Sequence, residues 1–71
     1  MLSYTDHARD RIWERGFTNQ DVEYCLLHYH TCYTDRKGNS IYRADLPDVR
    51  AIKVVTKADS TDPVVVITVA D

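Results

Sequence analysis

The sequence predicts a small α+β domain in which two helices precede four strands, in the order ααββββ. Two runs near the N-terminus have the apolar spacing of helices, and each follows a capping residue. From Cys32 onward, Thr, Tyr, Ile and Val replace the helix formers, and turn clusters separate the apolar runs. A chain of 71 residues has room for one domain, so residues 1–71 are expected to form a single unit.

Both helices are predicted from their capping residues. The first begins at Thr5-Asp6, contains no Pro or Gly, carries basic residues in its last turn, and ends at Gly16. The second begins at Thr18, with Asp21 three residues later as the partner of a capping box. Its buried stripe has the spacing i, i+3, i+4, i+7 and is formed by Val22, Cys25, Leu26 and Tyr29. We therefore expect the second helix to run to about His30.

Four strands are expected at 31–35, 40–46, 50–57 and 64–70, with turns at 35–39, 47–48 and 58–63. Because these connections are too short for a crossover helix, neighbouring strands should be antiparallel and form a meander. Two short helices can cover one face of such a sheet, and the other face should stay open.

Strict alternation along each strand predicts which side chains face the helices. The helix-facing set is Tyr42, Ala44, Leu46, Ile52, Val54, Val65, Ile67 and Val69. The open-face set is Ile41, Arg43, Asp45, Ala51, Lys53, Val55, Val64, Val66 and Thr68. A one-residue slip would exchange the two sets. The last strand is apolar on both faces, which favours pairing with a second copy of the chain, so a homodimer is expected.

The composition limits the classes of function. Nine Lys and Arg against 11 Asp and Glu give a net charge of −2, which argues against a protein that coats nucleic acid non-specifically. No apolar run approaches the roughly 20 residues that span a bilayer, and no signal peptide is evident, so we expect a cytoplasmic protein without a membrane role and with reduced thiols. Nucleotide, dinucleotide and zinc-protease motifs are absent, and no cofactor is expected.

The first candidate site is a cationic stripe on the first helix. His7, Arg11 and Arg15 follow at four-residue steps and so lie on one slowly drifting face. Like charges at this spacing call for an anion, either a carboxylate of the chain or an external phosphate. A solvated helix face gives the same pattern. His7 is a candidate proton acceptor, because histidine is the residue type that exchanges protons near neutral pH.

The second candidate site is on the sheet, where Arg43 and Lys53 should lie on adjacent strands near Tyr33, Tyr42 and Thr68. Cleavage of RNA through the 2′-hydroxyl needs a base, a cation for the phosphate and an acid, and these residue types provide all three without metal. Alternating polar residues on an open sheet face also serve solubility alone. Arg36 and Lys37 give a basic tip to the turn 35–39, which can contact a phosphate backbone or be a plain hairpin turn.

The third candidate is a set of zinc-competent side chains, Cys25, His28, His30 and Cys32, within eight residues. Cys25 also belongs to the buried stripe of the second helix, where a free thiol acts as a small apolar group. Because His28 lies away from that stripe, we expect histidines at a helix end rather than a metal site.

The motifs His7-x3-Arg11-x3-Arg15-Gly16, Phe17-Thr18-x-x-Asp21-Val22, Tyr42-Arg43 and Ile67-Thr68-Val69 resemble a family of small bacterial domains of unknown function. That family is similar to compact toxins of the RelE/BrnT fold, in which two helices lead a curled antiparallel sheet. The better-known members are metal-independent ribonucleases in toxin–antitoxin pairs. The resemblance covers essentially the whole chain, and the motif residues are His7, Arg11, Arg15, Tyr42, Arg43 and Thr68.

Two functions follow as expectations. The first is a metal-independent endoribonuclease of the toxin type, in which His7 is the base or acid, Arg11 and Arg15 hold phosphate, and Arg43 and Lys53 stabilise the transition state. Arg36, Lys37, Tyr42 and Thr68 would contact the RNA, and an antitoxin would be the protein partner. The alternative is a non-catalytic interaction domain, in which the arginines are paired internally and the apolar last strand mediates dimerisation.

Overall fold

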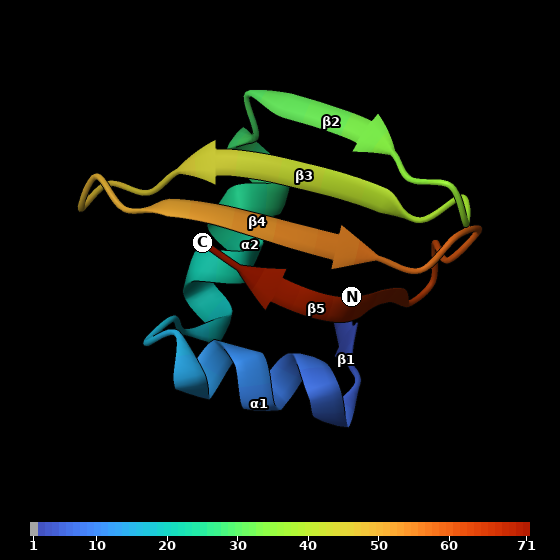
Figure 1. Ribbon diagram of the computed structural model, residues 1–71, viewed down its shortest axis with the longest axis horizontal. Helices are drawn as coiled ribbons and strands as arrows, with labels where there is room; N and C mark the ends of the chain where they lie inside the picture. Colours follow the sequence, from blue (N-terminus) through green and yellow to red (C-terminus); the bar gives the residue numbers. More distant parts are fainter. Residues whose placement is uncertain (1) are drawn as a thin grey trace.

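The computed structural model describes residues 2–71, which form two helices and five strands (Figure 1). The first strand, β1 (Leu2–Tyr4), leads into α1 (Asp6–Glu14) and α2 (Asn19–His28). The remaining strands are β2 (Thr31–Thr34), β3 (Ser40–Asp45), β4 (Ala51–Thr56) and β5 (Val64–Ala70). The predicted α+β class is confirmed, and each of the last four strands lies where the turn clusters place it.

The sheet has five strands in the order β1-β5-β4-β3-β2, so the expectation of four antiparallel strands is wrong. Strands β2 to β5 form the expected antiparallel meander, whereas β1 pairs parallel with β5, Leu2 opposite Val64 and Tyr4 opposite Val66. The Thr5 N–H continues this contact by donating to the Val66 carbonyl at 3.1 Å. Strand β1 was not predicted, because its three residues are too few to show an alternating pattern. Its pairing partner also lies at the other end of the chain.

Capping begins both helices as predicted. The Thr5 hydroxyl accepts a hydrogen bond from the Ala8 N–H at 3.0 Å, and Thr18 and Asp21 form a complete capping box. The first helix ends at Glu14, and Gly16 then takes a φ of +71°, a conformation that favours glycine. The second helix ends at His28 rather than near His30, because Tyr29 adopts an extended backbone. This earlier end leaves His30 in the link to β2.

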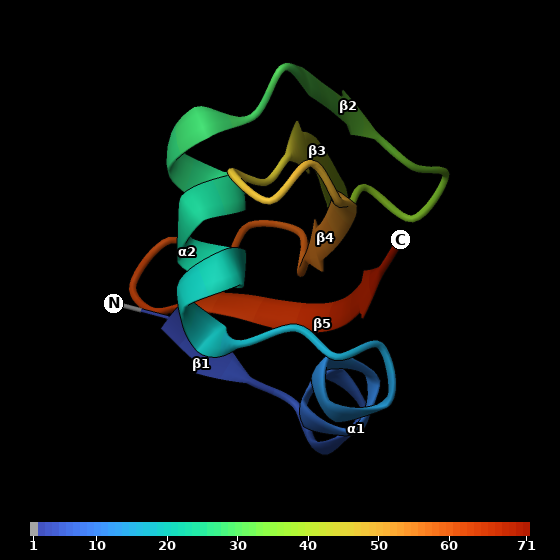
Figure 2. The ribbon, with the colours of Figure 1, turned by 90° about the vertical axis from the view of Figure 1, so that its left-hand side faces the viewer.

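The two helices enclose one core from different sides. Figure 1 shows α2 passing behind β3 and β4, and Figure 2, turned by 90°, shows α1 alongside β5. Within residues 2–71, no helix covers β3 and β4 on the face of the sheet that is toward the viewer in Figure 1. The core cluster comprises Ala8, Ile12, Phe17, Val22, Cys25, Ala44, Leu46, Ile52, Val54, Val66 and Val69. The expected open face therefore exists over the middle of the sheet.

A β-bulge in β5 corrects part of the predicted alternation. Val69 lies opposite Val54 and Thr68 opposite Val55, but Thr56 lies opposite Val66, so Ile67 is an extra residue. The extra residue shifts the alternation by one, and Val66 enters the core at 0% exposure, although strict alternation puts it on the open face. Val65 and Ile67, which were expected among the helix-facing residues, are only partly buried.

Strand β5 is an interior strand, with β1 on one side and β4 on the other. Residues Val64–Val66 are hydrogen-bonded to β1, and the Thr5 hydroxyl donates to the Ile67 carbonyl at 3.0 Å. Backbone pairing of this strand with a second copy, which was the expected route to a dimer, is therefore blocked along residues 64–67. Strand β2 is the edge strand next to β3, and its four residues are all exposed.

Candidate functional site

The open face of the sheet brings two cations together. Arg43 on β3 lies directly opposite Lys53 on β4. The row across the sheet runs from Thr31 on β2 through Arg43 and Lys53 to Ala70 on β5. Side chains of directly opposed residues share a face with about 5 Å between their Cβ atoms. Within residues 2–71, neither cation has a carboxylate within 4.0 Å. The Arg43–Lys53 pair is thus a local positive site on a chain with a net charge of −2.

A second row of side chains lies two residues along the strands from this pair. Tyr33, Ile41, Val55 and Thr68 are opposed in turn across β2, β3, β4 and β5. The Tyr33 ring is 44% exposed, and Ile41 and Val55 are partly exposed beside it. Thr68 therefore lies on the open face as predicted. The cationic row and this apolar row are about 7 Å apart, given the rise of roughly 3.3 Å per residue.

His30 and Asp45 lie at the end of the open face next to Arg43. The His30 N–H donates to the Arg43 carbonyl at 2.9 Å, which holds the residue in line with β2. Its imidazole Nδ1 lies 2.7 Å from the Thr31 hydroxyl, and its Nε2 lies 3.9 Å from an Asp45 carboxylate oxygen. The side chains of His30 and Asp45 are 52% and 74% exposed. Sequence reasoning missed this contact, because it extended the second helix to about His30.

The cationic stripe on α1 is separated from the sheet residues. His7 and Arg11 lie on α1, which packs on β5, and Arg15 is the C-cap residue of this helix. Arg43 lies on β3, and β4 separates β3 from β5. Arg11 pairs with Glu14 at 3.1 Å and Arg15 pairs with Asp71 at 3.1 Å. The five expected catalytic residues thus divide into two groups. In the α1 group, Arg11 and the C-cap residue Arg15 already have acidic partners, and His7 is exposed in the first turn.

The remaining residues predicted to contact RNA lie on different parts of the surface. Tyr42 lies opposite Val54, on the helix side of the sheet, and its ring packs edge-on against Tyr29 at 5.0 Å. Arg36 and Lys37 are exposed at the hairpin tip, where the Asp35 carboxylate accepts hydrogen bonds from the Lys37 and Asn39 N–H groups. Only Thr68 of this set shares the open face with Arg43 and Lys53.

The zinc-competent set does not converge. Cys25 is fully buried and its thiol donates to the Tyr42 carbonyl at 3.6 Å, whereas Cys32 is exposed on β2. Burial raises the pKa of the Cys25 thiol to about 11, so it stays protonated at neutral pH. The His28 ring packs near Tyr24, with 4.6 Å between ring centroids. In the described part of the chain, no three His, Cys, Asp or Glu side chains group closely enough to hold a metal ion.

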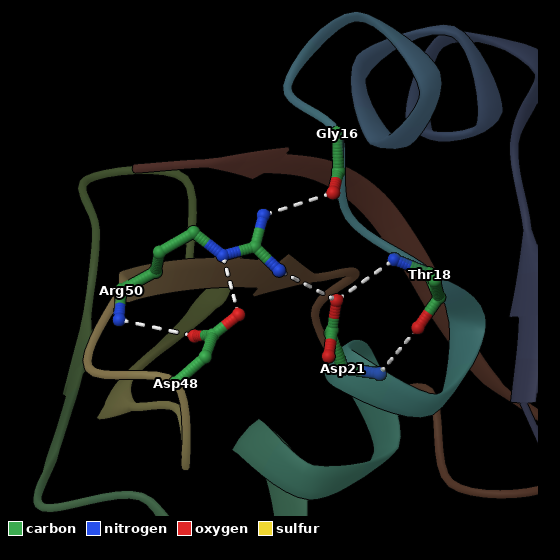
Figure 3. Close-up of polar contacts among 5 residues, drawn as sticks. All are labelled: Gly16, Thr18, Asp21, Asp48 and Arg50. Carbon is green, nitrogen blue, oxygen red and sulfur yellow. Dashed lines mark hydrogen bonds and ion pairs between the residues drawn. The ribbon is translucent and has the colours of Figure 1, made fainter.

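A network around Arg50 fixes the end of the domain where α1, α2 and the β3–β4 turn meet (Figure 3). Its guanidinium donates to the Asp48 carboxylate at 2.8 Å and to the Gly16 carbonyl at 2.9 Å, and lies 3.5 Å from an Asp21 oxygen. The same group stands 5.0 Å from the centre of the Phe17 ring. The sequence gives no periodic signal for Arg50, because its partners come from three separate segments.

Replacing Arg50 by alanine should lower the free energy of unfolding by about 1–2 kcal/mol, because several partly exposed contacts are lost together. Urea denaturation at neutral pH measures this change. Arg9→Ala on the exposed side of α1 is the matched control and should change stability by less than about 0.5 kcal/mol. Equal effects of the two substitutions would show that the Arg50 network does not hold the helices to the turn.

Fold and surface together define a small α+β domain with one helix-covered sheet face and one open face that presents a pair of cations. The chain belongs to the family described as a domain of unknown function (DUF4258), whose model matches residues 4–71. No curated protein and no solved structure matches the chain significantly. Among residues 2–71, neither helix is long and apolar enough to cross a membrane. The family description assigns no activity.

Proposed function

We propose that the domain binds RNA on the open face of its sheet and cleaves it without a metal ion, as the toxin-like component of a toxin–antitoxin pair. The observation that carries this proposal is the direct opposition of Arg43 and Lys53 on adjacent strands. Like charges in directly opposed positions destabilise a sheet. An anion between them removes that cost, and phosphate is an anion that both Arg and Lys bind.

The second row of the open face favours a nucleic acid strand over a free phosphate. A single strand presents bases beside its phosphates, and proteins that bind it combine a cationic track with exposed aromatic side chains. Tyr33 offers such a ring about 7 Å from the cationic row, and the apolar surface of Ile41 and Val55 continues beside it. A single strand suits this face, because its unpaired bases are free to stack on the Tyr33 ring.

Cleavage without metal is consistent with the residue types on this face. Arg43 and Lys53 can stabilise the extra negative charge of a pentavalent phosphate, which is the largest requirement of the reaction. The resemblance of the chain to compact RelE/BrnT toxins supports the same activity. An antitoxin that blocks the reaction would cover the open face with acidic side chains, since opposite charge gives complementarity there.

Removal of either cation should weaken RNA binding. We expect Arg43→Gln and Lys53→Gln each to raise Kd for a labelled single-stranded RNA about tenfold, or about 1.4 kcal/mol. Each substitution should also reduce the slope of log K against log salt by about 0.7, because one fewer counterion is released. Fluorescence anisotropy at several salt concentrations measures both quantities.

Arg9→Gln is the control for a general loss of positive charge, because Arg9 is exposed on α1, away from the cationic row. It should leave Kd within about twofold. An equal weakening by all three substitutions would show that binding depends on net charge and not on the open face. Cleavage is tested with the same RNA in EDTA, with the matching DNA as a substrate that lacks the 2′-hydroxyl. Cleavage of RNA alone is expected, and its absence would remove the enzymatic part of the proposal.

A further inference from the structure

His30, on the link between α2 and β2, is hydrogen-bonded through its backbone to Arg43 of the Arg43–Lys53 pair. Its backbone is tied to the Arg43 carbonyl, and its ring contacts Thr31, which lies in the same row as Arg43 and Lys53. Of the three histidines, His7 lies on α1, which packs on β5, and His28 is the last residue of α2, the helix that passes behind β3 and β4 in Figure 1. His30 is therefore the histidine placed to act on a phosphodiester held by the cationic pair.

We propose that His30 is the general base of the RNA cleavage and that Asp45 positions its ring. This inference rests on the proposed function, and it assigns the catalytic histidine to the β2 end of the open face rather than to α1. The arrangement contains a proton acceptor, a carboxylate on the far side of the ring, and two cations for the phosphate, all contributed by β3, β4 and the segment that enters β2.

The proposed role uses the tautomer of the His30 imidazole that carries its N–H at Nε2. In this tautomer the N–H faces the Asp45 carboxylate, which has an oxygen 3.9 Å from Nε2, and the lone pair of the neutral ring is at Nδ1. Nδ1 then accepts from the Thr31 hydroxyl, which lies 2.7 Å away. The Thr31 hydroxyl thus marks the position in which a ribose 2′-hydroxyl can donate to the same nitrogen.

The reaction is an internal transfer of the phosphoryl group. Nδ1 of His30 takes the proton of the 2′-hydroxyl, and the 2′-oxygen forms a bond to the adjacent phosphorus as the bond from phosphorus to the 5′-oxygen breaks. The 5′-oxygen takes a proton from water, and the imidazolium returns its proton to the solvent. The products are a 2′,3′-cyclic phosphate and a 5′-hydroxyl, with no oxidant, reductant or metal ion consumed. Asp45 stabilises the imidazolium that forms in between.

The test uses full-length protein, a single-stranded RNA oligonucleotide and EDTA. His30→Gln should lower kcat about 100-fold or more, because a general base contributes at least that factor, while Kd for the RNA stays within about twofold. His28→Gln is the matched control and should cleave as the wild type does, since it removes another exposed histidine, at the last residue of α2, whose ring packs near Tyr24. Mass spectrometry should identify the cyclic phosphate end. Circular dichroism confirms that each variant is folded.

Asp45→Asn tests the positioning role. It should lower kcat about tenfold with KM within twofold, and Asp45→Glu should restore part of the loss. An equal rise of KM would instead indicate a role in binding or in local structure.

Three outcomes separate this inference from the function on which it rests. Wild-type rates in His30→Gln, in a protein that does cleave RNA, overturn the assignment and leave the ribonuclease proposal standing. A loss of activity in His7→Gln with none in His30→Gln has the same meaning and places the base on α1. A wild-type protein that binds RNA but never cleaves it overturns both the base assignment and the enzymatic proposal, while RNA binding through Arg43 and Lys53 remains.

Discussion

Replacing Val66 by aspartate should unfold the domain, whereas the same substitution at Thr68, two residues along β5, should leave it folded. Val66 is fully buried in the core, and the Thr68 side chain lies on the open face because the bulge at Ile67 shifts the alternation. A carboxylate without a partner in an apolar core costs several kcal/mol. The whole domain is expected to be stable by only about 4–11 kcal/mol, at 0.05–0.15 kcal/mol per residue.

Far-UV circular dichroism and urea denaturation at neutral pH compare the two variants directly. Strict alternation places Val66 and Thr68 on the same face and predicts equal effects. A folded Val66→Asp variant, or the same loss of stability in both variants, would contradict the bulge and with it the position of Thr68 beside Val55 on the open face.

Raising the pH from 9 to 11 should lower the free energy of unfolding through Cys25. Burial raises the pKa of this thiol from 9.0 to about 11, so the folded protein keeps a proton that the unfolded chain releases above pH 9. The stability linked to the thiol is complete below pH 9 and is lost as the pH rises through about 11. The slope is at most about 1.4 kcal/mol per pH unit, which gives a loss of ~2–3 kcal/mol over the window.

Urea denaturation at pH 8, 9.5 and 10.5 measures this dependence. Cys25→Ala should flatten most of it, and Cys32→Ala, which removes the exposed thiol, should keep the wild-type slope. A smaller fall remains in Cys25→Ala, because burial and the nearby charge of Glu23 also raise the pKa of Tyr4. Identical pH profiles for the wild type and Cys25→Ala would show that the Cys25 thiol is not held in an apolar environment.

Local chemistry explains which parts of the fold were predictable. The hydroxyl groups of Thr5 and Thr18 cap their helices by accepting hydrogen bonds from backbone N–H groups three residues later. The start of each helix can therefore be predicted from neighbouring residues. The hairpin turn at Pro47-Asp48 sets the register that opposes Arg43 and Lys53, and this pair was expected on adjacent strands. Features that rest on short-range contacts were thus available from the sequence.

The parts that were missed depend on distant partners. Strand β1 forms because Leu2–Tyr4 pairs with Val64–Val66, and a pattern of three residues cannot predict that distant pairing. The bulge at Ile67 cannot be predicted from the sequence pattern, because every residue of this apolar run is suited to the core. The approach of His30 to Asp45 requires α2 to stop at His28, and helix ends are the least certain feature of a periodic pattern.

Nuclear magnetic resonance tests whether the Arg43–Lys53 face of the sheet binds RNA. A two-dimensional ¹H–¹⁵N spectrum of the domain is recorded as a short single-stranded RNA with 2′-deoxy positions, which resist cleavage, is added. The largest shifts are predicted for the amides of Thr31, Tyr33, Arg43, Lys53 and Thr68, which share the two rows of the open face. Shifts centred on α1 around His7 and Arg11, or none at all, would contradict RNA binding at this face.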